Sequence, residues 1–209
     1  MKNITVIIIL VFTSLYVNAQ NQEAQNVIGV RAGFSVTGGF IKAAGKLEDN
    51  SLDTLQRETS TSNLPALSFT YDYGISDEFS VGLLTSIQTF NGSVKNYGFN
   101  TPNDTFIVEN IDFTLRRIYV GIAPKYHWAT SNEKVDLYSG IRLGYIIWVN
   151  NIETSDPNFD IFDKFNVGRP SFNLVPIGGN FYFDDNFGAN FELAIGAPYI
   201  FSAGLQYKF

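Results

Sequence analysis

Cysteine is absent from the 209 residues, which excludes a disulfide scaffold, a thiol nucleophile and a lipid anchor on cysteine. Charged residues are also scarce, at 16% against the about 25% that is usual for soluble domains. The formal net charge is -6, so a nucleic-acid partner is not expected. No low-complexity linker divides the chain, and we therefore expect one domain.

Long apolar runs are missing after residue 20, where the longest, near residues 145–149, is far below the about 20 residues of a membrane-spanning helix. The N-terminus differs, with Lys2, an apolar core over residues 4–15 and the small-residue end Val17-Asn18-Ala19. This pattern predicts a signal peptide over residues 1–19 and a mature domain over residues 20–209. Removal of Lys2 with no acid would change the net charge from -6 to -7. A retained membrane anchor is the alternative interpretation. It is less favoured because the apolar core is shorter than the about 20 residues that a membrane-spanning helix needs.

Aromatic residues are abundant, with 19 Phe and 11 Tyr, and many follow an alternating pattern. The clearest example covers residues 187–209, in two runs that meet at Gly196-Ala197-Pro198. Small or polar residues fill most even positions, and apolar residues fill the odd ones: Phe187, Ala189, Phe191, Leu193 and Ile195, then Tyr199, Phe201, Ala203, Leu205, Tyr207 and Phe209. The pattern predicts two strands, each with one apolar face.

Six further strands are predicted upstream from the same alternation. They cover residues 27–37, 64–75, 79–90, about 117–128, 135–147 and 169–183. Long polar segments (38–63, 91–110 and 150–168) alternate with short turns (76–78, 129–134 and 184–186) as connections. This alternation is typical of an up-and-down barrel, and eight strands make the smallest common closed one. The predicted fold is therefore all-β, an eight-stranded antiparallel up-and-down transmembrane β-barrel.

Two prolines disturb these patterns. Pro124 cannot donate to a strand ladder, so we expect a bulge there, close to the end of its strand. In the strand over residues 169–183, Phe172 and Leu174 keep one parity, whereas Val175, Ile177, Phe181 and Phe183 keep the other. Pro176 and Gly178-Gly179 predict a bulge where the parity switches.

The apolar parity is expected to face lipid. A soluble lipocalin-like barrel would turn the apolar face inward, but the other face is rich in Gly, Ser and Thr with few charges, which makes a poor solvent surface. Small residues suit a narrow eight-stranded lumen. Aromatic residues near the strand ends suit an interfacial girdle: Tyr73, Phe79, Tyr126, Trp128, Phe187, Tyr207 and Phe209.

A set of charged residues shares the inward parity. We expect them to form a paired ionic network that plugs the lumen, because unpaired buried charges are costly: Arg31, Asp72, Arg117, Asp136, Arg142, Glu192 and Lys208. A selective pore lined by the same charges is the alternative interpretation.

Three segments resemble a known family. The signal end Ala19-Gln20, the strand VIGVRAGFS over residues 27–35 and the terminal GLQYKF over residues 204–209 are similar to the PorT-like small outer-membrane β-barrel proteins of Gram-negative bacteria. That family is broadly similar to eight-stranded barrels of the OmpA/OmpX type. The resemblance implies that Tyr207 and Phe209 form the signal read by the barrel-assembly machinery. PorT itself is associated with protein secretion and gliding.

Enzymatic and metal chemistry find little support in the sequence. Enzymes that modify lipid A on such barrels need a His with a Ser or Asp near the outer leaflet, whereas the single His127 is expected at the periplasmic end of its strand, as an interfacial or lumen-end residue. Asp156, Asn158 and Asp160 have the spacing of a calcium loop, but Pro157 intervenes and the turn Gly and final Glu are missing. We expect no metal and no cofactor.

The sequence thus predicts a non-enzymatic barrel of the cell outer membrane with a structural or interaction role through its extracellular loops. Expected partners are outer-membrane lipid and lipopolysaccharide, which divalent cations could bridge to the acidic loops, and the barrel-assembly machinery. A small pore or a PorT-like accessory that contacts secretion-system proteins is the alternative, and a lipid A-modifying enzyme is the least favoured.

Overall fold

The computed structural model describes residues 21–39, 58–100, 106–128, 130, 132–154 and 166–209. The predicted signal peptide, residues 1–19, lies outside the described residues, as does the calcium-like spacing at 156–160. Within the described ranges, nine strands form one sheet: β1 Asn26–Phe34, β2 Glu58–Asn63, β3 Ala66–Gly74, β4 Phe79–Asn100, β5 Phe106–Trp128, β6 Val135–Thr154, β7 Asn166–Tyr182, β8 Phe187–Ile195 and β9 Phe201–Lys208. In the described part of the chain, no helix has the length and hydropathy needed to span a membrane.

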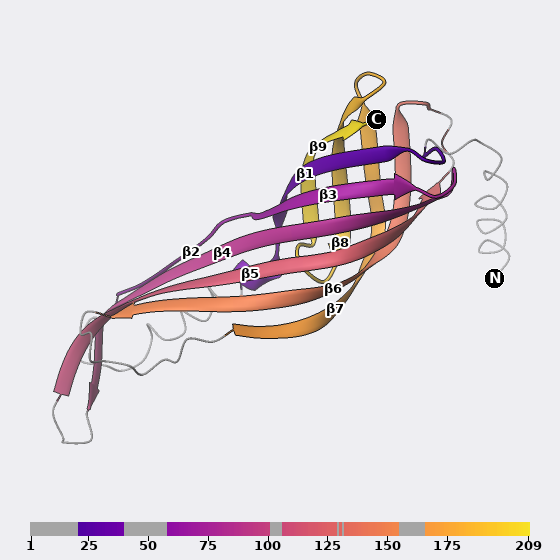
Figure 1. Cartoon of the computed structure of the whole chain (residues 1–209). Coiled ribbons are helices and arrows are strands. Elements are labelled where there is room, and N and C mark those ends of the chain that lie inside the picture. The colour runs from indigo at the N-terminus through magenta and orange to yellow at the C-terminus, as the bar shows by residue number, and fades with distance from the viewer. Residues whose placement is uncertain (1–20, 40–57, 101–105, 129, 131, 155–165) are drawn as a thin grey trace, which may run out of the picture.

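Eight of the nine strands close into a ring (Figure 1). All pairings are antiparallel, and β1 closes the ring because it pairs with β3 on one side and β9 on the other. At Val30, for example, the partners are Phe69 and Leu205. β2 is the ninth strand. It pairs with the same edge of β4 as β3 does, further along β4, and Leu64-Pro65 separates the two strands. The predicted eight-stranded antiparallel barrel is confirmed.

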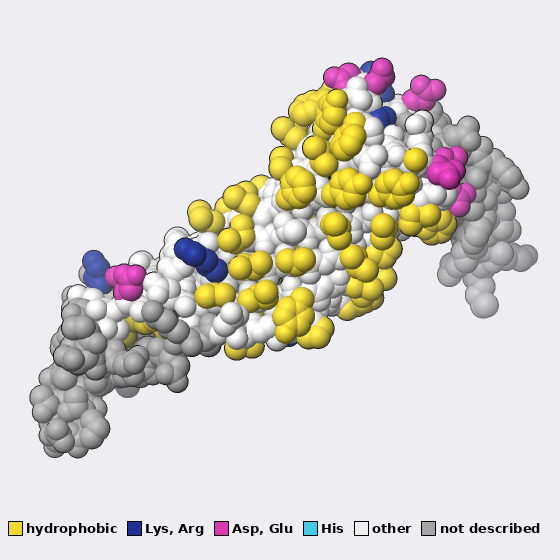
Figure 2. All heavy atoms as spheres, in the orientation of Figure 1, with side chains coloured by type: hydrophobic (Ala, Val, Ile, Leu, Met, Phe, Trp, Pro, Cys, Tyr) yellow, Lys and Arg dark blue, Asp and Glu magenta, His cyan; other side chains and the backbone are white. Residues whose placement is uncertain are grey.

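Burial along the strands is inverted relative to a soluble protein. Large apolar side chains are exposed on the outer wall, with Val30, Leu67 and Phe172 at 57%, 60% and 66%, while polar residues such as Gln88 and Ser202 are buried inside. Figure 2 shows the hydrophobic side chains spread over the barrel wall and the charged ones gathered toward the two ends of the molecule. A wall of this kind fits an apolar surrounding, and a small lumen then has to be filled by polar side chains.

The two halves of the barrel wall differ in length. β1, β3, β8 and β9 have 8 or 9 residues, whereas β4, β5, β6 and β7 have 22, 23, 20 and 17. The short turns that follow β3, β5 and β7 lie at one end, the turn end, together with the C-terminus, where the backbone groups of Asn26 and Phe209 bond to each other. The turn between β8 and β9 lies at the other end, where the Ile200 N–H donates to the Phe34 carbonyl. At the other end the long strands continue past the ring (Figure 1). We call this part the extension: β2 with residues 89–100, 106–116, 149–154 and 166–171.

The extension corrects part of the loop prediction. Residues 58–63, 91–100 and 106–110 belong to strands, as do 150–154 and 166–168. Pairs such as Asn91↔Thr114 and Ser93↔Asp112 join polar residues on the outer face of the extension, and the Thr114 hydroxyl also donates to Asn91 Oδ1 at 3.1 Å. The period-two alternation continues in residues 111–116 of β5 with the faces exchanged: Ile111, Phe113 and Leu115 share the parity of the buried Arg117, whereas the exposed Asp112 and Arg116 have the other parity. A search for apolar residues on the outward parity therefore does not find these strands.

The predicted bulge at Pro176 is confirmed. β7 carries one extra residue there relative to both neighbours, since its register shifts between Leu174 and Ile177 against β8 and at the same level against β6. Val175 is buried inside the barrel, so the parity switches after it and not before it as predicted.

The bulge predicted at Pro124 is not formed. Pro124 stays in register with Val81 of β4, and the register with β6 is unchanged between Ile122↔Leu143 and Lys125↔Gly140. Proline has no backbone N–H to donate. As a result Ala123 and Pro124 have no ladder partner in β6, and no extra residue is inserted in the strand.

Tyr199 is a further correction, because it was assigned to the outward face of the last strand. It lies in the turn over residues 196–200, before β9 begins, and is fully buried. The turn folds inward at Gly196, whose φ of 121° suits glycine. The Tyr199 ring therefore fills the lumen.

Candidate functional site

The polar lumen contains most of the charged residues predicted to line it. Six of the seven have exposed fractions of 9% or less: Arg31, Asp72, Arg117, Asp136, Arg142 and Glu192. Each is placed there by the period-two geometry of its strand, which turns alternate side chains inward. The structure does not join all seven into one network. It separates five of them into three groups and leaves Arg117 and Lys208 apart.

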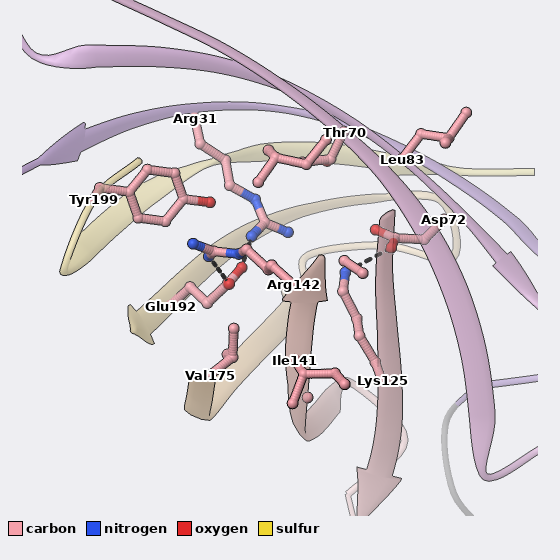
Figure 3. Close-up of a pocket in the computed structure, with 13 residues that line it drawn as sticks. Arg31, Thr70, Asp72, Leu83, Lys125, Ile141, Arg142, Val175, Glu192 and Tyr199 are labelled. Carbon is pink, nitrogen blue, oxygen red and sulfur yellow. Dashed lines mark hydrogen bonds and ion pairs between the residues drawn. The ribbon is translucent and has the colours of Figure 1, made fainter. Parts of the chain in front are cut away.

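The first group is centred on Glu192 of β8 (Figure 3). One carboxylate oxygen accepts from Arg31 of β1 and the other from Arg142 of β6. The Tyr138 hydroxyl donates to the same carboxylate at 3.1 Å, and the Tyr199 ring lies 4.4 Å from the Arg142 guanidinium carbon. Glu192 thus ties strands from the short and long halves of the wall.

The second group pairs Asp72 of β3 with Lys125 of β5, at 2.6 Å between Oδ1 and Nζ. The Lys125 ammonium also lies 4.7 Å from the centre of the Tyr138 ring. Lys125 is absent from the predicted set, although it has the same parity as Arg117 and the sequence signal was therefore present. A cavity of about 10 Å³ lies between this pair and the Glu192 group, which is room for about one water molecule.

The third group lies at the turn end, where Asp136 contacts His127 and Asn180. His127 was expected as an interfacial or lumen-end residue. It lies at the lumen end of β5, is 4% exposed and also contacts Ser80. Sequence reasoning missed this contact because Ser80 and His127 are far apart in the chain, and only the β4–β5 register brings them together.

Arg117 stands by itself toward the extension. Its guanidinium donates to Gln88 Oε1 at 2.5 Å, to Thr37 Oγ1 at 2.9 Å and to the Pro198 carbonyl. Phe90 and Trp148 lie beside it, with ring centres 5.8 and 5.6 Å away. Within the described ranges no carboxylate pairs with it, so its predicted ion pair is replaced by neutral acceptors and aromatic faces.

Lys208 lies at the turn end of β9, half-buried, with its ammonium 4.4 Å from the Tyr182 ring centre. The predicted assembly residues Tyr207 and Phe209 lie on the outer wall nearby, 45% and 59% exposed, with ring centres 6.2 Å apart. Their recognition by the assembly machinery stays a prediction.

The turn over residues 184–186, outside the barrel wall, contains a carboxylate that accepts two backbone hydrogen bonds. Asp184 Oδ1 accepts backbone N–H groups of Phe187 at 2.6 Å and Asn186 at 2.9 Å. These hydrogen bonds lower the pKa of the Asp184 carboxyl below its ordinary value, because they stabilise the ionised form. In the described part of the chain, no three His, Asp or Glu side chains are grouped so as to hold a metal.

No protein-family model and no curated protein matches the chain. Solved structures with a similar fold include OprG, an outer-membrane protein of Pseudomonas aeruginosa, at 12% identity and a TM-score of 0.49, covering 92% of this chain and 99% of that one. Ail, the attachment invasion locus protein of Yersinia pestis, in complex with sucrose octasulfate, has 13% identity and a TM-score of 0.45, with 90% and 100% covered. Outer membrane protein W of E. coli has 12% identity and a TM-score of 0.41, with 90% and 99% covered. The assignment of the closed barrel rests on the strand pairing itself.

Proposed function

We propose that the chain is a protein of the bacterial outer membrane, with a non-enzymatic structural and interaction role that its extension performs outside the cell. The observation that carries this proposal is the difference between the two ends of the barrel. Among the described residues, the strands are joined at one end by short turns, while the other end carries strands far longer than the about 9 to 11 residues that cross a bilayer.

The wall of short strands supports the membrane location. Its strands have 8 or 9 residues, close to the length needed to cross, and their outward side chains are apolar. Outward aromatic residues gather at the turn end, where Phe79 and Tyr126 pack edge to face at 5.2 Å. Such a girdle fits the interfacial region, with the turn end in the periplasm. Outer-membrane lipid and lipopolysaccharide are then the expected surroundings.

The extension supports an interaction role. β8 joins β7 only from Leu174, so residues 166–173 of β7 pair on one side alone among the described strands. An exposed strand edge is a template for strand addition by a partner protein. The residues around Arg116, including Asn151 and Glu153, also line a polar hollow of the extension.

A small pore has less support, because the cavity between the buried ion pairs has room for about one water molecule. Membership of the PorT-like family, recognition by the barrel-assembly machinery and contact with secretion-system proteins remain part of the proposal. The support for this part of the proposal is the terminal GLQYKF segment, whose residues 204–208 lie in β9 and pair with β1 in the ring.

The test combines topology with conductance. An epitope inserted at position 103 should be accessible to antibody on intact cells, and the matched insertion at position 132, in a turn of the other end, should become accessible only after the outer membrane is opened. The purified protein in planar bilayers should give no steady channels. Accessibility of position 132 on intact cells would overturn the orientation, and steady conductance would overturn the plugged lumen.

A further inference from the structure

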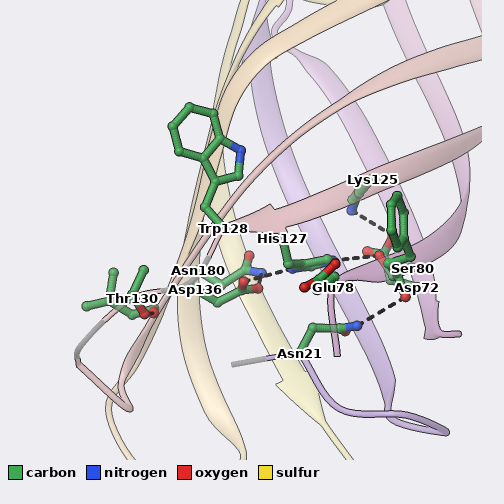
Figure 4. Close-up of polar contacts among 12 residues, drawn as sticks. Asn21, Asp72, Glu78, Ser80, Lys125, His127, Trp128, Thr130, Asp136 and Asn180 are labelled. Carbon is green, nitrogen blue, oxygen red and sulfur yellow. Dashed lines mark hydrogen bonds and ion pairs between the residues drawn. The ribbon is translucent and has the colours of Figure 1, made fainter. Parts of the chain in front are cut away.

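A chain of hydrogen bonds crosses four neighbouring strands at the turn end of the lumen (Figure 4). Ser80 Oγ of β4 lies 2.7 Å from His127 Nε2 of β5, and His127 Nδ1 lies 2.7 Å from Asp136 Oδ1 of β6. Asn180 of β7 donates its amide to the second oxygen of Asp136 at 2.7 Å. Both contacts of the imidazole are within the range for proton transfer between a base and its partners.

Asp136 sets the direction of these hydrogen bonds. An ionised carboxylate only accepts, so His127 Nδ1 carries the ring proton and Nε2 is left as the acceptor for the Ser80 hydroxyl. The imidazole is therefore placed to remove the proton of Ser80, while Asn180 holds Asp136 in position. A nucleophile, a base and an orienting acid in this order activate serine in acyl-transfer enzymes of unrelated folds.

We propose that Ser80 is a nucleophile that reacts with short-chain carboxylic esters, with His127 as its general base and Asp136 as the positioning residue. This activity would be additional to the interaction role of the extension, and it does not depend on that role.

The surroundings of Ser80 limit what can react there. Lys125 is its direct partner in the β4–β5 ladder, and its ammonium is paired with Asp72 at 2.6 Å, so it can contribute to an oxyanion that develops on an ester only in addition to that ion pair. Asn21 donates to the carbonyl groups of Ser76 and Phe79, at 2.5 and 3.2 Å, and so holds the N-terminal residues 21–25 beside the site. Ser80 is 3% exposed, so access requires these residues to move. The charged, filled lumen beyond leaves no room for a long acyl chain.

The reaction balances without a cofactor. Ser80 Oγ bonds to the ester carbonyl carbon while its proton passes to His127 Nε2. The carbon–oxygen bond to the alcohol then breaks, and the alcohol leaves with that proton. Water attacks the acyl-serine by the same route, which releases the carboxylic acid and restores the serine hydroxyl.

The test uses the purified folded barrel in detergent with a biotinylated fluorophosphonate, which phosphonylates activated serines. The wild type should take up one label, located on Ser80 by peptide mass spectrometry, and should release p-nitrophenol from p-nitrophenyl acetate. The variant S80A should lose both. H127A and D136N should lower the labelling rate by about 100-fold or more, and added imidazole should partly restore H127A.

Two further variants test whether the label depends on the activation of Ser80. S86A controls for a buried serine without an imidazole, and N21A tests whether burial limits the labelling rate. Ser86 lies on the same face of β4, is 5% exposed and bonds to the Ser68 hydroxyl at 3.0 Å, with no imidazole involved, so S86A should label like the wild type. N21A removes contacts that hold the N-terminal residues and should raise the rate about fivefold. Absence of label on Ser80 in both the wild type and N21A, in barrels that migrate as folded species before heating, would overturn the proposal. So would a labelling rate that D136N leaves unchanged.

Discussion

The two halves of the wall share the same alternation inside the ring but differ in the length of their strands. The short half consists of β1, β3, β8 and β9, and the long half of β4 to β7. The short strands have 8 or 9 residues, about the length that a bilayer requires, and their outer side chains are apolar throughout. The long strands have the same pattern inside the ring, and in the extension the faces are exchanged, since Ile111 is buried while Asp112 and Arg116 are exposed. The comparison teaches that one period of two serves two outer surfaces, an apolar one along the ring and a polar one along the extension.

The lumen joins the two halves, and we expect its central acid to have the largest effect on stability. Glu192 of the short half accepts from Arg31 and from Arg142 of the long half, and Glu192→Ala would leave two buried guanidinium groups without their carboxylate. The free energy of unfolding should fall by about 3 to 5 kcal/mol, measured by urea titration in lipid vesicles. Glu153→Gln, on the exposed extension, should change it by less than about 0.5 kcal/mol. Equal effects of the two variants would contradict the separation of lumen from extension.

The second prediction compares the outer faces of the two parts. Leu205 lies in the middle of β9 and is 47% exposed on the wall, so Leu205→Lys should place a charge in the hydrocarbon and cost about 2 to 4 kcal/mol. Asn151→Lys, on the outer face of the extension, should cost little because that face is in water. The same urea titration measures both, and a tolerated lysine at position 205 would argue against lipid contact there.

The third prediction concerns packing inside the long half. A Cβ on Gly144 would lie 2.5 Å from the buried Tyr119 ring and 2.6 Å from the carbonyl oxygen of Val120. Gly144→Ala should therefore destabilise the barrel by about 1 to 3 kcal/mol through overpacking. Gly39→Ala is the matched control, because a Cβ there would meet nothing within 4 Å. A neutral Gly144→Ala would mean that the lumen is looser than the contacts indicate.

The smallest effect is expected in the 184–186 turn, which belongs to neither half. Asp184 has a lowered pKa because it accepts two backbone N–H groups, so its stabilising contribution is present above the ordinary carboxyl pKa. That contribution is lost as the pH falls through the lowered value. Asp184→Asn should be slightly less stable than the wild type at neutral pH and equal to it in strong acid, with Asp185→Asn as the control. A difference that persists in strong acid would contradict this account.

Much of the barrel could be predicted from the sequence, because an apolar outer wall around a polar lumen requires alternation along each strand of the ring. The closing strand 201–208, the parity switch at Pro176 and the inward charges at Arg31 and Glu192 all follow from it. The extension was not predicted, because its apolar residues change to the inward parity: Ile111 and Phe113 share the parity of the buried Arg117, not that of the outward Val120. Tyr199 was misplaced because a turn interrupts the parity just before β9.

The candidate sites show a different limit. Which residues face inward can be predicted from parity, but which of them meet depends on register and strand tilt. Asp72 meets Lys125, Arg117 meets neutral acceptors, and His127 meets both Ser80 and Asp136. These partners come from separate strands, so the period of any single strand carries no signal for them.

The central claim is that the barrel turns its apolar face to lipid and its polar face to the lumen. Because the chain has no cysteine, single spin labels can be placed along β9 at positions 202 to 207 in lipid vesicles, and their collision rates with oxygen and with a water-soluble nickel complex measured. The account predicts high oxygen and low nickel accessibility at 203, 205 and 207, and low accessibility to oxygen at 202, 204 and 206. Accessibility without alternation, or nickel collisions at 203, 205 and 207, would contradict it.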